Sequence, residues 1–106
     1  MDKTIHPIVA TRLKELEALC RRFRVRRLDL FGSATGSQFD PARSDLDFLL
    51  EYLPSAKELY PDVYFDLKDE LERLFGRNVD SVMVTAIRNP YFLEEVEETR
   101  VQLYAA

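Results

Sequence analysis

The spacing of apolar residues predicts a helix near the amino terminus. They recur three or four positions apart, which places them along one side of a helix. These residues are Val9, Leu13, Leu16, Cys20 and Phe23. Pro7 suits the first turn, where the N–H group that proline lacks would have no partner inside the helix. We therefore expect one helix from about Pro7 to Phe23.

Three strands are predicted further along the chain. Polar and apolar residues alternate from Val25 to Phe31, a pattern typical of a strand with one covered face. Residues 45–52 are largely apolar on both faces after Asp47, which suits a central strand. Residues 78–84 form a third short apolar segment. A turn-rich segment with two glycines and a proline separates the first two strands.

Two more helices complete the pattern. One runs from about Pro61 to Phe75 and is expected to end at Gly76. Its apolar face carries Val63, Leu67, Leu71 and Leu74. The other follows Pro90 and continues far enough to include Leu103. The apolar residues on one side of it are Phe92, Val96 and Leu103.

Length and composition fit one globular domain, residues 1–106, with 46% hydrophobic and 32% charged residues. The net charge of −4 argues against direct nucleic-acid binding, which depends on neutralising phosphates. Apolar runs are too short to cross a membrane or to form a signal peptide, so we expect a cytoplasmic protein. The single cysteine and single histidine exclude a disulfide and argue against zinc sites. Carboxylates must carry most of the chemistry.

Three carboxylates stand where strands begin. Asp45 and Asp47 open the second strand, and residues two apart in a strand point to the same face, about 6.6–6.8 Å apart. Asp80 lies at the start of the third strand, among valines. Exposed carboxylates this close repel one another, whereas a hard divalent cation makes the same arrangement attractive. The three residues therefore predict a site for one or two Mg²⁺ ions in phosphoryl transfer.

Structural roles for these acids stay open as alternatives. Asp45 and Asp47 could be a capping pair between a loop and a strand, and Asp80 could pair with Arg77 or Arg88. The turn at Gly32 and Ser33 favours the functional interpretation. Without a Cβ at Gly32, backbone N–H groups there can approach a polyphosphate, and the Ser33 hydroxyl adds a donor.

The topology follows from bringing these residues together. Gly32 and Ser33 end the first strand and Asp45 begins the second, so these two strands must be antiparallel. For Asp80 to join them, the second and third strands must be parallel, with the helix of residues 61–75 as the crossover. We therefore predict an α/β (α+β) fold with a small mixed sheet packed against helices.

The sequence also resembles a known family. Gly32-Ser33, eleven further residues and then Asp45-Leu46-Asp47 resemble the signature of the DNA polymerase β-type nucleotidyltransferase superfamily. Nearly the whole chain is similar to the minimal nucleotidyltransferases, or MntA-like (MNT) antitoxins. The resemblance implies a nucleotidyltransferase fold and Mg²⁺ held by the catalytic acids Asp45, Asp47 and Asp80. It further implies ATP bound by Gly32 and Ser33, and transfer of AMP to a tyrosine of a HEPN-domain toxin.

One departure from the family pattern leaves two other functions open. Relatives often carry an arginine three residues after the motif serine, but this position is Gly36, so Arg43 or Arg88 would have to supply the cation. An antitoxin that acts by binding alone is one alternative. A nucleotidyltransferase for small molecules such as antibiotics is the other, although such enzymes generally need further domains. A single small sheet leaves the acceptor surface to a partner or another copy, so a homo- or hetero-oligomer is expected.

Overall fold

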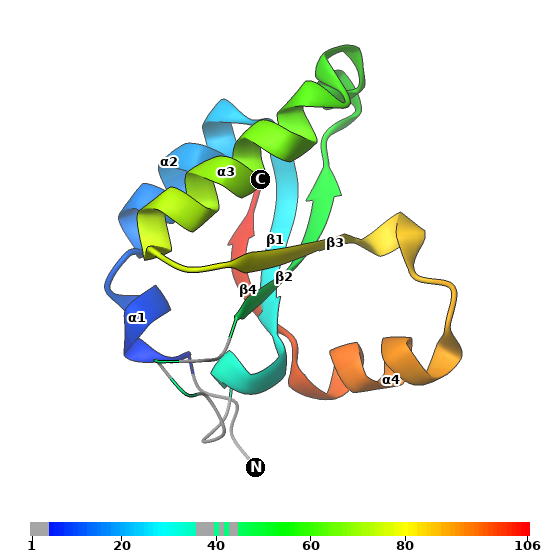
Figure 1. The fold of residues 1–106 in the computed structure, drawn as a ribbon. Coiled ribbons are helices and arrows are strands. Elements are labelled where there is room, and N and C mark those ends of the chain that lie inside the picture. Colours follow the sequence, from blue (N-terminus) through cyan, green and yellow to red (C-terminus); the bar gives the residue numbers. More distant parts are fainter. Residues whose placement is uncertain (1–4, 36–39, 41, 43–44) are drawn as a thin grey trace.

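A mixed β-sheet is the centre of the fold (Figure 1). The computed structural model describes residues 5–35, 40, 42 and 45–106. The strands within these residues are β1 (Val25–Phe31), β2 (Leu46–Tyr52), β3 (Val79–Met83) and β4 (Val101–Ala105), in the sheet order β3-β2-β1-β4. β1 pairs antiparallel with β2 and β4, and β2 pairs parallel with β3. The predicted mixed sheet is confirmed.

Helices cover both faces of this sheet. α2 and α3 lie on one side and α4 lies across from them (Figure 1). The helices are α1 (Pro7–Ala10), α2 (Leu13–Arg22), α3 (Asp62–Phe75) and α4 (Pro90–Thr99), with short 3₁₀ turns at η1 (Gly32–Thr35), η2 (Pro54–Leu59) and η3 (Val84–Ala86). Among the described residues, no helix is long and apolar enough to cross a membrane.

The main core lies between the sheet and the helices α2 and α3. Leu30 of β1 and Phe48 of β2 are fully buried in it, and the ring of Phe48 stacks on Phe75 with centroids 5.9 Å apart. A smaller core under α4 contains Phe31, Leu49 and Val96. Because neighbouring strand residues point to opposite faces, Leu30 and Phe31 enter different cores.

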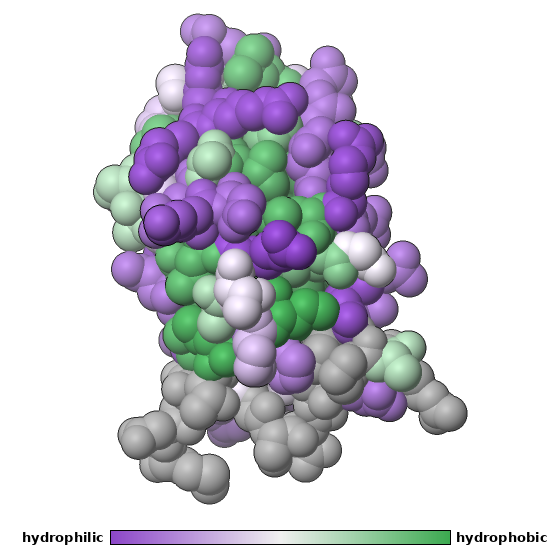
Figure 2. All heavy atoms as spheres, turned by 90° about the vertical axis from the view of Figure 1, so that its left-hand side faces the viewer, coloured by the Kyte–Doolittle hydropathy of each residue, from purple (hydrophilic) through white to green (hydrophobic). Residues whose placement is uncertain are grey.

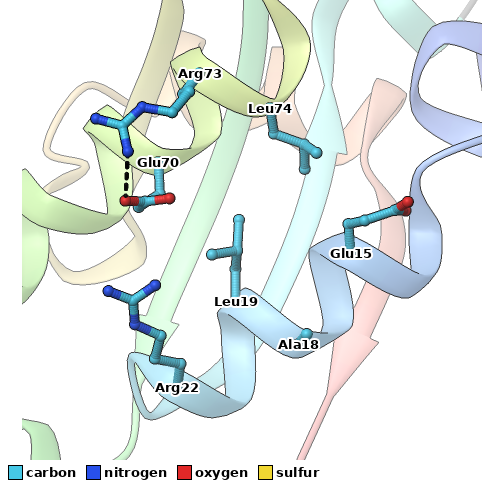
Figure 3. Close-up of a pocket in the computed structure, with 7 residues that line it drawn as sticks. All are labelled: Glu15, Ala18, Leu19, Arg22, Glu70, Arg73 and Leu74. Atoms are coloured by element: carbon cyan, nitrogen blue, oxygen red, sulfur yellow. Dashed lines mark hydrogen bonds and ion pairs between the residues drawn. The ribbon is translucent and has the colours of Figure 1, made fainter.

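The outer side of α2 and α3 is mostly hydrophilic. Figure 2 shows hydrophilic side chains over the upper part of this face, with hydrophobic ones gathered between and below them. A groove of about 430 Å³ lies between the two helices (Figure 3). Leu19 and Leu74 face it, and an ion pair of 3.1 Å between Glu70 and Arg73 borders it.

The prediction of one continuous first helix is wrong. The chain leaves the helix after Ala10 and begins α2 at Leu13, with Arg12 at φ −119°. Thr11 closes α1, because its hydroxyl donates to the carbonyl of Pro7 at 2.9 Å. Val9 and Leu16 are nevertheless both fully buried in the same core. The apolar spacing therefore recorded which residues are buried and not whether the helix is continuous.

The last helix is shorter than predicted. It ends at Thr99, and Arg100 has extended backbone angles of φ −62° and ψ 137°. Leu103 lies in β4, which pairs with β1 along the edge of the sheet. A short apolar segment fits a helix or a strand equally well by spacing alone, and pairing with β1 decides between them here.

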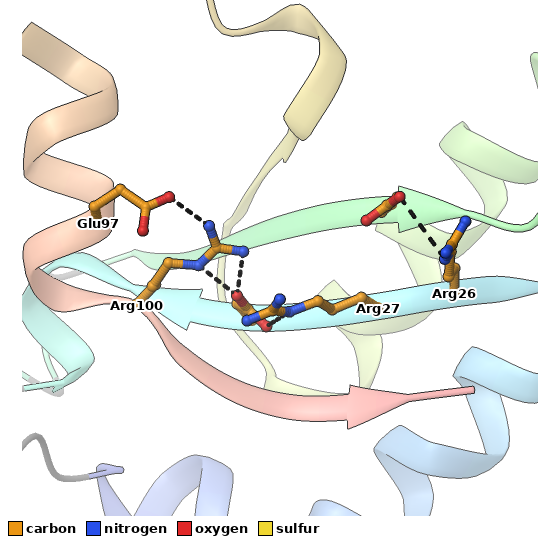
Figure 4. A network of polar contacts seen from close by, with 6 residues as sticks. Arg26, Arg27, Glu97 and Arg100 are labelled. Carbon is orange, nitrogen blue, oxygen red and sulfur yellow. Dashed lines mark hydrogen bonds and ion pairs between the residues drawn. The ribbon is translucent and has the colours of Figure 1, made fainter. Parts of the chain in front are cut away.

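A buried ion-pair network holds the end of α4 to β1 (Figure 4). Asp29 of β1 is completely buried. Arg27 donates to one of its carboxylate oxygens at 2.9 Å, and Arg100 donates to the other through Nε at 2.7 Å and Nη2 at 2.6 Å. Arg100 also pairs with Glu97 at 2.6 Å. Asp29 is thus buried and paired with an arginine on both oxygens.

Arg100→Gln is expected to lower the free energy of unfolding by about 3 kcal/mol, because it leaves Asp29 buried with half of its pairing. Arg27→Gln is expected to cost less, since 41% of the Arg27 side chain is exposed against 18% for Arg100. Urea unfolding measures both. The control is Arg73→Gln, whose exposed ion pair should be worth less than about 1 kcal/mol. Equal losses for Arg100→Gln and Arg73→Gln would contradict this account.

Candidate active site

Asp47 and Asp80 lie side by side at the start of two parallel strands. They are register partners in the pairing of β2 with β3, and each is the second residue of its strand. The start of β3 is fixed by the side chain of Glu72, which accepts the backbone N–H of Val79 at 3.1 Å. Asp47 is half-buried and Asp80 is exposed. Among the described residues neither forms an ion pair, so the alternative that Asp80 pairs with Arg77 or Arg88 finds no support.

The turn at Gly32 packs directly against Asp47. Phe31, the last residue of β1, is the register partner of Asp47 in β2, so the chain turns immediately beside this carboxylate. Gly32 has φ +77°, and a Cβ placed on it would lie 2.5 Å from Oδ2 of Asp47. Glycine suits this position, because any other residue would have a strained backbone there and its Cβ would have to displace the Asp47 carboxylate. Ser33 follows in η1 and is partly buried.

A pocket of about 270 Å³ joins the turn, the two acids and α4. Its lining residues are Phe31, Gly32, Asp47, Asp80, Phe92, Glu95 and Thr99. The sequence interpretation missed the contribution of α4, because it considered only the apolar residues on one side of that helix. The helical spacing of Phe92, Glu95 and Thr99 was visible, but no local signal indicated which side of α4 would face the two acids.

Asp47 is an unusually weak acid with a pKa raised from 3.8 to about 6. The largest cause is burial, which disfavours the charged form, and the negative charges of Asp80 and Asp45 add to it. A carboxylate with these neighbours favours binding a cation.

Asp45 comes directly before β2 and is exposed. Its negative charge adds to the rise in the pKa of Asp47. Among the described residues, no three Asp, Glu, His or Cys side chains gather closely enough to hold a metal ion. The structure brings Asp47 and Asp80 side by side, and the role of Asp45 as a third member of the set stays a prediction.

The donor set of this pocket fits a hard divalent cation. Carboxylate oxygens are the ligands that Mg²⁺ prefers, and the ion often binds through only one or two of them together with substrate phosphates. Asp47 and Asp80 provide two carboxylates on one wall of the pocket. No lysine or arginine is among the described residues that line it. Their role as metal ligands, with Asp45 as a third, stays a prediction.

Arg88, one of the two arginines considered as a replacement cation, does not line this pocket. Gly36 and Arg43 lie outside the described residues. Arg88 lines a different pocket of about 670 Å³, which it shares with Tyr52, Tyr60 and Met83 at the opposite ends of β2 and β3. In this structure Arg88 therefore does not supply a cation beside Asp47.

The chain belongs to the nucleotidyltransferase family, because the nucleotidyltransferase domain matches residues 13–103. Two Methanocaldococcus jannaschii proteins, provisionally named protein adenylyltransferases, are each 33% identical to it. Each match covers 91% of this chain and 94% of the relative. The resemblance seen in the sequence is confirmed, and the chain is an enzyme of the nucleotidyltransferase class. Nucleotidyltransferases generally use a divalent metal ion.

Solved structures share the fold. One, provisionally described as a minimal nucleotidyltransferase, has a TM-score of 0.69 and 28% identity, covering 88% of this chain and 90% of its own. A second is a tri-AMPylated Shewanella oneidensis HEPN toxin in complex with an MNT antitoxin, with a TM-score of 0.60, 18% identity and coverage of 92% and 72%. A third, a toxin–antitoxin structure with AMP-PNP, has a TM-score of 0.63, 20% identity and coverage of 89% and 73%.

Gly32→Ala is expected to destabilise the protein by about 3 kcal/mol, from backbone strain plus the collision with Asp47. Gly76→Ala is the matched control. Gly76 also has a positive φ, of +64°, but a Cβ there would meet nothing within 4 Å, so only the strain of about 1 kcal/mol remains. Urea unfolding of both variants measures the difference. Equal losses would show that the contact between Gly32 and Asp47 is not tight.

Asp47→Asn is expected to stabilise the protein by about 1 kcal/mol at pH 7, allowing for solvent screening of this half-exposed group. The folded protein holds a charged Asp47 at a cost, because the pKa is raised from 3.8 to about 6. The gain should shrink as the pH falls below about 6 and vanish below about 4, where both folded and unfolded Asp47 are protonated. Urea unfolding across this range tests it, with exposed Asp66→Asn as control. A gain independent of pH would contradict the account.

Proposed function

We propose that this chain transfers AMP from ATP to a hydroxyl group of a partner protein. Asp47 and Asp80, joined by Asp45, would hold Mg²⁺, and the turn at Gly32 and Ser33 would bind the triphosphate. The observation that carries the proposal is the contact of this turn with Asp47, beside Asp80, in one pocket. The family match and the names of the relatives support the same reaction.

The reaction forms one bond and breaks another. The acceptor oxygen bonds to the α-phosphorus of ATP, and the bond to the leaving pyrophosphate breaks. Mg²⁺, when bound, neutralises charge that develops on the phosphate oxygens. Asp47 contributes a fixed negative oxygen beside the turn. Asp80, which is exposed, is suited to accept the proton that the acceptor hydroxyl loses.

The small size of the pocket and its position support a protein acceptor. The pocket of about 270 Å³ is bordered by the exposed helix α4, so the described residues offer little to enclose a second substrate. We propose a HEPN-domain toxin as the partner, a tyrosine as its acceptor residue and an antitoxin role for this chain. Support comes from the shared fold of an MNT antitoxin solved with a tri-AMPylated HEPN toxin.

Label transfer from ATP tests this proposal. The chain is incubated with α-labelled ATP, Mg²⁺ and a HEPN-domain partner, and label on the partner is located by mass spectrometry. Asp47→Asn and Asp80→Asn are each expected to reduce transfer at least about 100-fold, because each removes a negative oxygen beside the reacting phosphate. Asp66→Asn, on the exposed side of α3, is the matched control and should transfer as the unaltered chain does.

Three other outcomes have clear meanings. A tight complex that carries no label would replace the proposal with an antitoxin acting by binding alone. Label on an aminoglycoside or another small hydroxyl compound, and none on protein, would favour the small-molecule alternative. Transfer that persists in both aspartate variants would show that the reaction takes place elsewhere in the chain.

A further inference from the structure

The end of α4 is joined to the Gly32 turn through one threonine hydroxyl. The backbone N–H of Gly32 donates to Oγ1 of Thr99 at 2.9 Å, across 67 residues of sequence. The same hydroxyl donates its proton to the carbonyl of Glu95 at 3.2 Å. Its proton is therefore used within the helix, and a lone pair of its oxygen is directed to Gly32.

The other backbone group of Gly32 is also held. Its carbonyl accepts a hydrogen bond of 2.7 Å from the hydroxyl of Thr35, one turn further along η1. Both polar groups of this glycine are thus engaged, one locally and one by α4. The sequence analysis expects backbone N–H groups at this turn to approach a polyphosphate. In this structure the N–H of Gly32 donates to Thr99 instead.

Thr99 is itself fixed in position. The next residue, Arg100, makes the two-point contact with buried Asp29. Earlier in α4, Val96 is fully buried, and the ring of Phe92 meets Phe31 edge-on at 5.9 Å. The hydroxyl that holds the turn therefore belongs to a helix anchored along its length.

The turn has little freedom to shift. A displacement of Gly32 onto the Asp47 carboxylate is opposed, because a Cβ on Gly32 would already lie 2.5 Å from Oδ2 of Asp47. A displacement that separates the Gly32 N–H from Thr99 would break a hydrogen bond of 2.9 Å. Thr99 also lines the pocket that contains Asp47 and Asp80.

We propose that Thr99 is a positioning residue, which sets the placement of the Gly32–Ser33 turn relative to Asp47 and thereby aligns the site for a nucleoside triphosphate. This inference rests on the proposed function. It concerns where the turn lies and assigns Thr99 no contact with the reacting atoms.

Thr99→Val tests the inference, because valine has nearly the same shape but cannot accept the hydrogen bond. The dissociation constant of Mg·ATP by calorimetry and the KM for ATP are both expected to rise about 5- to 10-fold, the equivalent of one lost hydrogen bond. Thr99→Ser keeps the hydroxyl and should stay within about twofold of the unaltered chain. Thr11→Val is the matched control, since the exposed Thr11 hydroxyl donates only to Pro7 within α1.

Unaltered Mg·ATP affinity in Thr99→Val would overturn the inference, as would an equal loss in Thr99→Ser. A second measurement avoids dependence on the folding of the valine variant. In the unaltered chain and in Thr99→Ser, the Gly32 amide should exchange with solvent at least about 10-fold more slowly than an unbonded amide, by nuclear magnetic resonance. Fast exchange of Gly32 in both would equally overturn it. If Mg·ATP binding depends on Thr99 while no AMP is transferred, the proposed function fails and the positioning role stands.

Discussion

The candidate site depends on the register of three neighbouring strands. Phe31 in β1 is aligned with Asp47 in β2, and Asp47 is aligned with Asp80 in β3. β1 ends where β2 and β3 begin, because it is antiparallel to β2 and β2 is parallel to β3. The turn after β1 and the first residues of β2 and β3 therefore lie together at one end of the strands. A shift of one residue in either pairing would turn an acid towards the main core. The register thus places Asp47 beside Asp80 and also places Gly32 against Asp47.

Asp29 and Asp47 lie on the same face of the sheet but have opposite environments. Asp29 is completely buried, and both of its oxygens are paired with arginines, so its charge contributes to structure. Asp47 is half-buried, has no ion pair with a described residue, and has a pKa raised to about 6 by burial and by Asp80 and Asp45. A charge left uncompensated in the folded chain is typical of a binding site, because a ligand can supply the compensation. The end of α4 contacts both regions. Arg100 pairs with Asp29, and Thr99 accepts a hydrogen bond from the turn beside Asp47.

Local patterns predicted those parts of the fold that depend on nearby residues. The bounds of β1 and the end of α3 at Gly76 follow from alternation and from a left-handed glycine cap. The parallel pairing of β2 with β3 was predicted by requiring Asp80 to lie beside Asp47, and the helix between the two strands is the crossover that parallel strands require.

Contacts between distant segments could not be predicted in this way. The sequence extends the last helix into β4, because five residues of mixed polarity carry no decisive period. Only pairing with β1 defines these residues as a strand. Thr99 and Glu95 enter the pocket because α4 packs on Phe31 and Leu49, more than 45 residues away in the sequence. β2 begins at Leu46, one residue later than the sequence predicts, because its pairing with β3 begins at Leu46 and Val79. Each of these features depends on contacts between distant segments, and the spacing of apolar residues along the sequence does not reveal such contacts.

A crystal structure of the chain with Mg²⁺ and a non-hydrolysable ATP analogue is the most direct test of the central claim. The account predicts the ion between the carboxylates of Asp47 and Asp80, with the triphosphate against the Gly32–Ser33 turn. A nucleotide bound in the groove between α2 and α3, or in the pocket beside Arg88, with no ion at Asp47, would contradict it.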